Sequence, residues 1–451
     1  MSIVGIIAEY NPFHNGHKYH IEQAKKLTGA DAVVVVMSGD FVQRGTPAIM
    51  PKHLRTALAL QNGADLVLEL PVRFATGSAE FFSAGAVDIL DALGCVDFLC
   101  FGAEDNDLSL LMKIAEIFLE EPEIYRQALQ AALKKGASFP KAREQGLLAA
   151  MGNDPDTCVK ALQAVQNPNN ILAIEYLKEL KRINSPIKPV PLLRMGAGYH
   201  DMKVHSGKHP SVATASSSGK DHVFVEQPLA SASALRAILR RQPISSWKHL
   251  IPDNSLALLE RLNEKDFPVW EEDFTLLMKY QLLNETEESL QKYADFGVEL
   301  ANRAKKSSGS FKDYHQFVDL LHTKNETYAH VSRALLHMLL KITKKDISSY
   351  NFSNQATNDH DASTSFAHYA RILGFNHNSS WNMTEIKEKG RIPLITKLAQ
   401  IEELYKTEVL TEAGKEMLEE DIYASNLYET VRTDKFGSKF THEFQKQLEI
   451  I

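Results

Sequence analysis

The sequence contains little cysteine. Its three cysteines, Cys95, Cys100 and Cys158, are an odd number in a chain of 451 residues, and their spacing is not that of a zinc site. A fold held together by disulfides or by structural zinc is therefore not expected. The thiols are interpreted as core or inert groups of a protein that resides in a reducing compartment.

The sequence also lacks the features that direct a chain to a membrane. The apolar residues 1–8 have no basic leader, and Glu9 follows them directly, so we do not expect a signal peptide. No window reaches the ~18 consecutive apolar residues that a membrane-spanning helix needs. We therefore expect a cytoplasmic protein that does not associate with a membrane.

An excess of positive charge is missing as well. Lys and Arg number 50 and Asp and Glu 57, which gives a formal net charge of -7 at pH 7. The net charge thus argues against a protein that binds nucleic acid through an overall positive charge, whereas a local basic patch remains possible. With 44% hydrophobic and 24% charged residues, the chain is neither disordered nor a coiled coil. Its length predicts two or three domains, and no internal repeat is present.

What the sequence does contain is an alternation of short apolar runs with helix-like stretches near its start. The runs are rich in Val and Ile and cover residues 3–8, 32–37, 66–70 and 98–101. Helical stretches, which begin near His17, Pro51 and Ala79, separate them. This alternation predicts an α/β fold, a Rossmann-like domain whose parallel sheet is covered by helices on both faces.

Ligands of such sheets bind beyond the carboxyl ends of the strands. The segments expected to form the site are therefore residues 9–16, 38–48, 71–78 and 102–105.

The rest of the chain divides at about residue 242. Residues 109–182 have a helical pattern, residues 188–194 with two prolines predict an irregular edge strand, and the polar residues 196–221 predict a long loop. Later residues are mainly helical, with breaks at 305–310 and 349–365. We predict a catalytic α/β domain over residues 1–242 and a mainly α-helical domain over residues 243–451.

The turn after the first predicted strand carries the sequence His14-Asn15-Gly16-His17. Gly16 lets the backbone approach a ligand closely, and the free amides at the start of the following helix favour an anion. His14 and His17 can donate hydrogen bonds to phosphate oxygens as charge develops at the α-phosphorus, acting as electrostatic stabilisers and not as nucleophiles. A His-x-Gly-His segment in this context is typical of the nucleotidyltransferases that include class I aminoacyl-tRNA synthetases.

Two other interpretations of these histidines stay open. They are ordinary polar residues of a loop and a helix cap, or His14, His17 and His20 form a metal site. The second interpretation is weakened because no carboxylate or cysteine partner lies nearby in the sequence. We therefore expect no resident protein-bound metal.

A second segment, Ser231-Ala232-Ser233-Ala234-Leu235-Arg236, predicts a helix that begins with a serine cap and carries an arginine one turn later. It resembles the Ser-x-Thr-x-Ile-Arg segment that nucleotidyltransferases use against the triphosphate, with Leu235 in the place of Ile. The alternative is a plain capped helix. We take Arg236, with His14 and His17, as a candidate catalytic residue.

Five segments together resemble the bacterial tRNA(Met) cytidine acetate ligase family, from the first strand to near the C-terminus. They are residues 6–17 around His14, Phe41-Val42-Gln43-Arg44-Gly45, Pro168-Asn169-Asn170-Ile171-Leu172, Gly196-Ala197-Gly198-Tyr199-His200-Asp201 and Ile392-Pro393-Leu394-Ile395-Thr396-Lys397. The resemblance implies an enzyme that activates acetate with ATP, and Mg²⁺ on the phosphates, to acetyl-adenylate. It then passes the acetyl group to N4 of the wobble cytidine of elongator tRNA(Met). No protein partner is implied.

The resemblance also implies which residues contact ATP. These are Ile7, Ala8, Glu9, Tyr10, Asn11, Pro12, Phe13, His14, Asn15, Gly16, His17, Lys18, Tyr19, His20, Gly102, Asn169 and Arg194, with Asn170 as an alternative for the asparagine.

The two chemical steps make different demands. Acetate is ionised at pH 7 and needs no base, only charge neutralisation and in-line positioning, which His14, His17, Arg194, Arg236 and Mg²⁺ can supply. Transfer to cytosine N4 is harder, because that amine is a weak nucleophile and the base must leave its stack. No residue identifies itself as the base for this step. Asp40 and Glu104 are candidates by position alone.

Contacts with tRNA are predicted in basic clusters of the C-terminal half and just before it. The clusters are Arg240-Arg241 and residues 303–306, 341–345 and 432–439, with Lys344 and Lys345 as the chosen RNA-binding residues. Each cluster taken alone is more often a solvated helix face. A small-molecule adenylyltransferase and a non-catalytic RNA-binding protein remain as alternative functions, whereas the absence of a Lys-Met-Ser-Lys-Ser segment disfavours an ordinary class I synthetase.

Overall fold

A computed structural model describes the chain except for residues 106, 153, 195–229, 243–246, 262–265, 349–365 and 380. The predicted loop at 196–221, the segment Gly196–Asp201 and the predicted break at 349–365 lie outside the described residues. Among the helices that are described, none is both long and apolar enough to cross a membrane.

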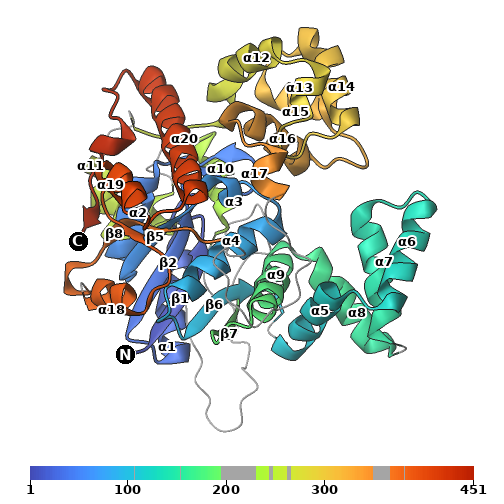
Figure 1. Ribbon diagram of the computed structural model, residues 1–451, viewed down its shortest axis with the longest axis horizontal. Helices are drawn as coiled ribbons and strands as arrows, with labels where there is room; N and C mark the ends of the chain where they lie inside the picture. The colour runs from blue at the N-terminus through green and yellow to red at the C-terminus, as the bar shows by residue number, and fades with distance from the viewer. Residues whose placement is uncertain are drawn as a thin grey trace.

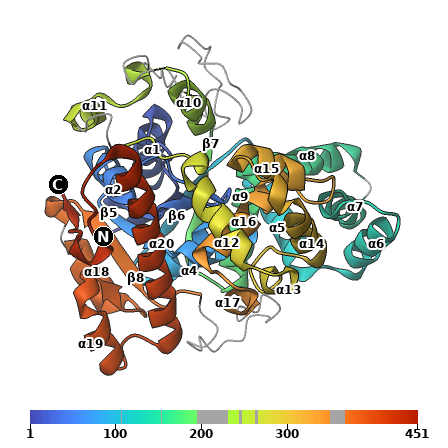
Figure 2. The ribbon, with the colours of Figure 1, turned by 90° about the horizontal axis from the view of Figure 1, so that it is seen from above.

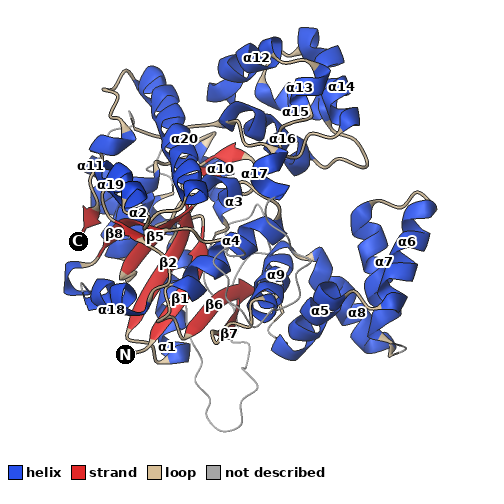
Figure 3. Cartoon of the chain, viewed as in Figure 1, coloured by secondary structure: helices blue, strands red, loops and turns tan. Residues whose placement is uncertain are grey.

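A mostly parallel sheet forms the centre of the molecule, with helices around it (Figures 1 and 3). Its parallel strands run in the order β5-β2-β1-β6-β7, so that the order reverses at β1. The predicted α/β fold, its four apolar strands and its edge strand are confirmed. The strands are β1 (Ile3–Ala8), β2 (Ala32–Ser38), β5 (Leu66–Leu70), β6 (Phe98–Ala103) and β7 (Lys188–Leu193).

Alternate residues of the strands enter two different cores, which explains the continuous apolar runs. Val34 and Val36 of β2 pack in one core, whereas Val33 and Val35 pack in the other. The first core holds α4 (Ala79–Ala92) and α9 (Pro168–Arg182), and the second holds α1 (Asn15–Thr28) and α2 (Lys52–Gln61). The sheet is thus covered on both faces.

Helices between β6 and β7 form an extension beside the β7 edge, on the side opposite to the C-terminal helices in both Figure 1 and Figure 2. They are α5 (Leu108–Glu120), α6 (Glu123–Lys134), α7 (Phe139–Met151) and α8 (Pro155–Gln166), and they lead into α9. Shorter elements lie between β2 and α4. These are β3 (Phe41–Val42), β4 (Thr46–Pro47) and α3 (Val72–Ala75).

Beyond α10 (Ala232–Leu239) and α11 (Asp253–Arg261), a cluster of helices has a core of its own. We call it the helical cluster. It consists of α12 (Thr275–Asn284), α13 (Glu287–Leu290), α14 (Val298–Ser307), α15 (Tyr314–Leu321), α16 (Tyr328–Leu340) and α17 (Lys344–Ser348). Phe41 and Val72, which follow β2 and β5, belong to the same core, so the cluster docks at the carboxyl edge of the sheet.

The last part of the chain returns to the sheet, which the sequence pattern did not predict. β8 (Ala370–Phe375) pairs antiparallel with β5, and β9 (Leu394–Ile395) and β10 (Glu449–Ile450) pair with β8. A short apolar run among helices does not distinguish a strand from a buried helical turn. The division at residue 242 stays a prediction, but strands from beyond it complete the first sheet.

Three helices accompany these strands: α18 (Trp381–Lys389), α19 (Ile401–Lys406) and α20 (Glu412–Phe436). Single 3₁₀ turns connect the later elements and occupy Lys248–Leu250, Glu271–Phe274, Ser308–Ser310, His377–Ser379, Leu398–Gln400 and Glu443–Gln445.

A buried network of charges fastens this C-terminal part to the first. Lys52 of α2 lies 2.7 Å from Glu69 of β5 and 2.9 Å from Glu443, measured between Nζ and the nearer carboxylate oxygen. Arg371 of β8 lies 2.7 Å from Glu69 and 2.6 Å from Glu443. All four side chains are at most 6% exposed. Each buried charge is therefore compensated by partners from distant parts of the sequence.

Candidate active site

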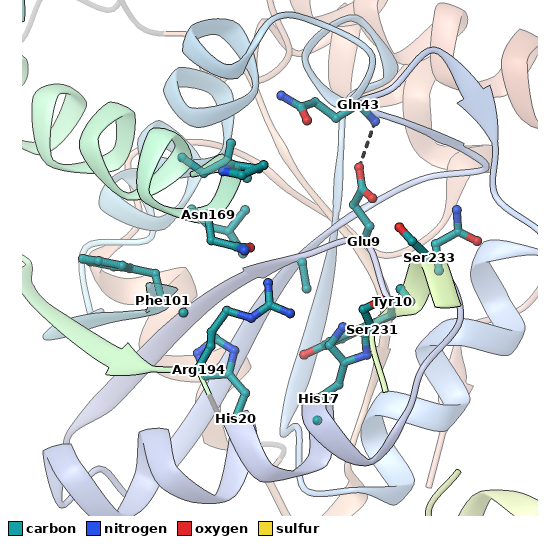
Figure 4. Close-up of a pocket in the computed structure, with 18 of the residues that line it drawn as sticks. Glu9, Tyr10, His17, His20, Gln43, Phe101, Asn169, Arg194, Ser231 and Ser233 are labelled. Carbon is teal, nitrogen blue, oxygen red and sulfur yellow. Dashed lines mark hydrogen bonds between the residues drawn. The ribbon is translucent and has the colours of Figure 1, made fainter. Parts of the chain in front are cut away.

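A cavity of about 430 Å³ opens at the carboxyl ends of β1 and β6, where the strand order reverses (Figure 4). Ligands of doubly wound sheets bind at this kind of position. The volume is within the ~300–1,000 Å³ of ordinary ligand pockets. The starts of α1, α9 and α10 and the turn between β3 and β4 complete the wall.

The His14-Asn15-Gly16-His17 turn holds its two imidazoles in a fixed arrangement. Nδ1 of His14 accepts a hydrogen bond from the Gly16 N–H at 3.0 Å, and Nδ1 of His17 accepts one from the His14 N–H at 3.3 Å. The two rings stack with centroids 3.7 Å apart. Because each Nδ1 is an acceptor, each neutral ring carries its proton on Nε2. Both histidines therefore offer an Nε2–H donor to the cavity that they line.

The electrostatics of the turn keep these imidazoles neutral. Burial, reinforced by the positive charges of Arg194 and Arg236, lowers the pKa of His14 to about 3. Burial and the neighbouring His14, His20 and Arg194 lower the pKa of His17 well below its usual value. At pH 7 both rings are thus uncharged donors, and the positive charge of the site comes from arginine.

Two glycines are required by close approaches in the site. A Cβ on Gly16 would lie 2.9 Å from Cε1 of His14, which would push that ring out of its position. A Cβ on Gly102 would lie 3.3 Å from Cγ of Arg194. Both glycines leave room for side chains that line the cavity.

Three arginines line the cavity: Arg44, Arg194 and Arg236. Burial lowers the pKa of all three, and the carboxylate of Glu9 opposes this for Arg44 and Arg236. Among the cavity-lining residues that the structure describes, Glu9 is the one acidic side chain. An excess of buried positive charge beside free donors defines a site for a polyanion.

Arg236 is placed by the second motif of the sequence. Ser231 caps α10 by accepting a hydrogen bond from the Ala234 N–H at 3.1 Å. One turn later, Nη1 of Arg236 donates to the carbonyl of Asn11 at 2.7 Å, and Nη2 donates to Oγ of Ser233 at 3.2 Å. The motif is thus a capped helix that also carries a cation into the cavity.

The two neighbouring asparagines have different places. Asn169 lines the cavity, and its Nδ2 donates to Oε1 of Glu104. Asn170 is fully buried, and its Oδ1 accepts hydrogen bonds from the N–H groups of Glu104 at 2.9 Å and Asp105 at 3.3 Å. Asn170 therefore joins the end of β6 to the start of α9, and Asn169 is the one of the pair that can reach a ligand.

Neither carboxylate proposed by position as a base lines the cavity. Oε2 of Glu104 accepts a hydrogen bond from the Asn170 N–H at 3.1 Å. Oδ1 of Asp40 accepts one from the Lys52 N–H at 2.8 Å, and Asp40 is 4% exposed. Both carboxylates hold loops in place.

Most residues predicted to contact ATP do line the cavity. They are Ile7, Ala8, Glu9, Tyr10, Asn11, His14, Gly16, His17, Tyr19, His20, Gly102, Asn169 and Arg194, joined by the candidate catalytic Arg236.

The other predicted contacts stand behind the wall. Phe13 packs on Tyr10, with ring centroids 4.9 Å apart, and Nδ2 of Asn15 donates to the carbonyl of His249 at 3.1 Å. Lys18 forms an ion pair with Glu22 at 3.9 Å on the surface of α1. Pro12 and Asn170 are buried beside the wall. None of these residues lines the cavity.

Some cavity residues were not predicted to contact ATP, although residues 41–45 had been noted for their family resemblance. Gln43 and Arg44 come from the turn between β3 and β4, and Tyr176 comes from α9. The available signal was the position of residues 38–48 after the second strand, which predicted the segment but not the side chains.

The predicted RNA-binding residues lie in the helical cluster, apart from the cavity wall. Lys344 and Lys345 are exposed on α17, and Nζ of Lys344 donates to the carbonyl of Phe296 at 2.7 Å. Several cations of the other basic clusters pair with carboxylates. These pairs are Arg240 with Glu271 and Glu272, Arg303 with Glu326, Arg432 with Glu429 and Asp266, and Lys435 with Asp273.

A doubly wound sheet with a His-x-Gly-His turn at its switch point and buried arginines around it defines a nucleotidyltransferase fold. Consistently, the model of the HIGH nucleotidyl transferase family matches residues 1–443.

Individual relatives refine this class. The chain is 38% identical over 429 residues to the tRNA(Met) cytidine acetate ligase of Caldanaerobacter subterraneus subsp. tengcongensis, covering 95% of each chain. It is 36% identical over 446 residues to that of Acetivibrio thermocellus, covering 98% of this chain and 99% of the relative. Thermotoga maritima TmcAL, solved bound with alpha-thio ATP, is 29% identical and superposes with a TM-score of 0.83 over 100% of both chains. The chain belongs to the tRNA(Met) cytidine acetate ligase family, as its motifs had indicated.

Proposed function

We propose that the cavity binds ATP, and that the protein is a ligase that activates acetate as acetyl-adenylate and acetylates N4 of the wobble cytidine of elongator tRNA(Met). The observation that carries this proposal is the convergence of two Nε2–H donors and three arginines on one cavity. The names of the relatives and the ATP analogue bound by the Thermotoga maritima structure support the choice of ligand and reaction.

In the first step an oxygen of acetate attacks the α-phosphorus. One P–O bond forms, the bond to pyrophosphate breaks, and no proton moves. His14 and His17 donate to the oxygens that gain charge, and Arg194 and Arg236 neutralise the triphosphate. Mg²⁺ bound to the phosphate oxygens supplies further charge neutralisation. The imidazoles are neutral in the unliganded protein, so they meet the triphosphate as hydrogen-bond donors.

The neighbouring side chains have separate tasks in this assignment. Gly16 and Gly102 give the space that the ligand and Arg194 need. Asn169, held by Glu104 at the start of α9, provides a polar contact on the wall opposite to α10. Hydrogen bonds hold His14, His17 and Arg236 in place without ATP, and preorganised donors are the ones that accelerate displacement at phosphorus.

The tRNA is assigned to the helical cluster, which docks at the carboxyl edge of the sheet. A Cβ on Gly45 would lie 2.4 Å from the backbone nitrogen of Arg333, so α16 touches the turn that carries Gln43 and Arg44. A tRNA held by Lys344 and Lys345 on α17 would thus be bound by the same helical cluster that contacts this turn. A cytoplasmic location is part of the same proposal, because tRNA is the proposed substrate.

The proposal is tested by incubating the protein with ATP, radiolabelled acetate and bulk bacterial tRNA. Label is expected in RNA, as N4-acetylcytidine after digestion, and acetate is expected to support exchange of pyrophosphate into ATP. Label confined to a small molecule would contradict the tRNA assignment and indicate a small-molecule adenylyltransferase. Labelling of tRNA by acetyl-CoA without ATP would contradict the adenylate.

A further inference from the structure

Glu9 occupies a distinct position in the cavity. It directly follows β1, and Arg55 fixes its backbone, because Nη1 of Arg55 donates to the Glu9 carbonyl at 2.6 Å. The Gln43 N–H donates to Oε1 of Glu9 at 2.9 Å, which directs the carboxylate toward the turn between β3 and β4 (Figure 4). From the residues that the structure describes, Oε2 accepts no hydrogen bond. One oxygen is thus held in place and the other is available.

Other cavity groups are poorly suited to accept a proton. His14 and His17 use Nδ1 as an acceptor for a backbone N–H, and Nε2 already carries hydrogen. Arginine stays protonated in proteins. Burial raises the pKa of Tyr10 and Tyr176, so both phenols stay neutral. The carboxylates of Asp40 and Glu104 serve loops outside the wall. His20 also lines the cavity, and its Nε2 has no hydrogen-bond partner among the described residues, but burial and the charge of Arg194 lower its pKa to about 4. Glu9 is the one carboxylate of the described cavity wall.

We propose that Glu9 is the base that accepts the proton of the cytidine N4 amine during acetyl transfer. This inference rests on the proposed function. In the step, N4 forms a bond to the acetyl carbonyl carbon, the bond from that carbon to the adenylate oxygen breaks, and AMP leaves with the electron pair. One N4 proton moves to Oε2 of Glu9, which later returns it to water.

Two cations of the cavity wall interact with Glu9. Burial lowers the pKa of Arg44 and Arg236, and the negative charge of the Glu9 carboxylate opposes this shift. Removal of the N4 proton prevents the charge that would otherwise accumulate on nitrogen as the new bond forms. Activation of acetate, in contrast, involves no proton, so it does not depend on a base.

The separating experiment uses Glu9→Gln, which keeps the length of the side chain and an oxygen that can accept from the Gln43 N–H. Two assays follow the first step: acetate-dependent exchange of pyrophosphate into ATP, and trapping of the acetyl group by hydroxylamine, a strong nucleophile. A third assay measures single-turnover acetyl transfer from the preformed adenylate to saturating tRNA. Glu402→Gln is the matched control, because Glu402 is an exposed glutamate whose Oε1 lies 3.4 Å from Lys415 on the surface.

Because Glu9 also lines the cavity proposed for ATP, Glu9→Gln is expected to change exchange and hydroxamate formation to some extent. Transfer is expected to slow by about 10²-fold or more beyond that change, the usual contribution of a general base. Glu9→Asp, which retains a carboxylate, is expected to transfer faster than Glu9→Gln, and it also serves if the glutamine variant does not fold. Transfer within a few-fold of normal would overturn the inference, as would a parallel loss of exchange. If the unmodified protein shows no acetate-dependent exchange, the proposed function itself fails, and the role of Glu9 fails with it.

Discussion

Replacement of His17 by alanine distinguishes what its ring does for ATP from what it does for the fold. The imidazole offers Nε2–H to the cavity, accepts the His14 N–H through Nδ1 at 3.3 Å, and packs edge-on against Tyr10 with centroids 4.8 Å apart. Alanine removes all three interactions. The variant is therefore expected to lose activity and some stability, for different reasons.

The two losses have different sizes. Removal of one preorganised donor to developing charge slows a reaction by about 10²–10³, which corresponds to about 2.7–4 kcal/mol of transition-state stabilisation. Loss of a capping interaction at a helix start costs about 0.5–2 kcal/mol of folding stability. The predicted loss of exchange activity thus exceeds what partial unfolding could cause, provided that the protein is well folded at the assay temperature.

Acetate-dependent exchange of pyrophosphate into ATP measures the first quantity, and urea unfolding followed by circular dichroism measures the second. Ser289→Ala is the matched control, because Oγ of Ser289 accepts the Thr286 N–H at 2.7 Å in the same type of capping box at the start of α13. It should lose similar stability and no activity. Near-normal exchange by folded His17→Ala would refute the assignment of the phosphate turn.

Three further predictions concern charge. Lys52→Met leaves Glu69 buried with one partner fewer, so the free energy of unfolding in urea should fall by about 3–5 kcal/mol. An unchanged unfolding midpoint would contradict a structural role for the network. Burial lowers the pKa of His14 in the folded state to about 3, so the unfolded state binds more protons at acidic pH. As the pH falls from about 6.5 toward 3, His14 should therefore lower the free energy of unfolding by up to about 1.4 kcal/mol per pH unit. His14→Gln should flatten the measured acid dependence of urea unfolding, and an equal slope in both proteins would argue against a buried neutral ring. Charge reversal of Lys344 and Lys345 should raise the tRNA concentration needed for acetylation and weaken the salt dependence of tRNA binding, while pyrophosphate exchange stays normal. An unchanged KM for tRNA would show that α17 does not contact the RNA.

The sequence predicted the parts of the fold that local pattern determines. The runs at residues 3–8 and 66–70 coincide with β1 and β5, because strands buried on both faces are continuously apolar. β8 was missed, since its six residues pair with a strand some three hundred positions earlier and nothing local signals that partner. Long-range pairing is a property of packing, not of local periodicity.

The same distinction applies to the site. His14 and His17 were found because the turn that holds them is contiguous in sequence. Arg44 and Tyr176 meet that turn only through the arrangement of β3, β4 and α9, so no spacing revealed them. Asp40 was proposed from its place after a strand, but position does not tell which way a side chain turns, and its carboxylate binds the Lys52 N–H instead.

The buried network of Lys52, Glu69, Arg371 and Glu443 has a consequence for how this protein is made. The ribosome releases the ATP-binding turn first, yet β8, which begins at Ala370, and Glu443 emerge only near the end of synthesis. Until then β5 has an open edge and the charges of Lys52 and Glu69 lack two of their partners. A nascent or prematurely terminated chain, including one that ends near residue 242, therefore carries the phosphate turn without a finished sheet to hold it. We expect chaperones and proteases to recognise such a chain before it can act as an enzyme.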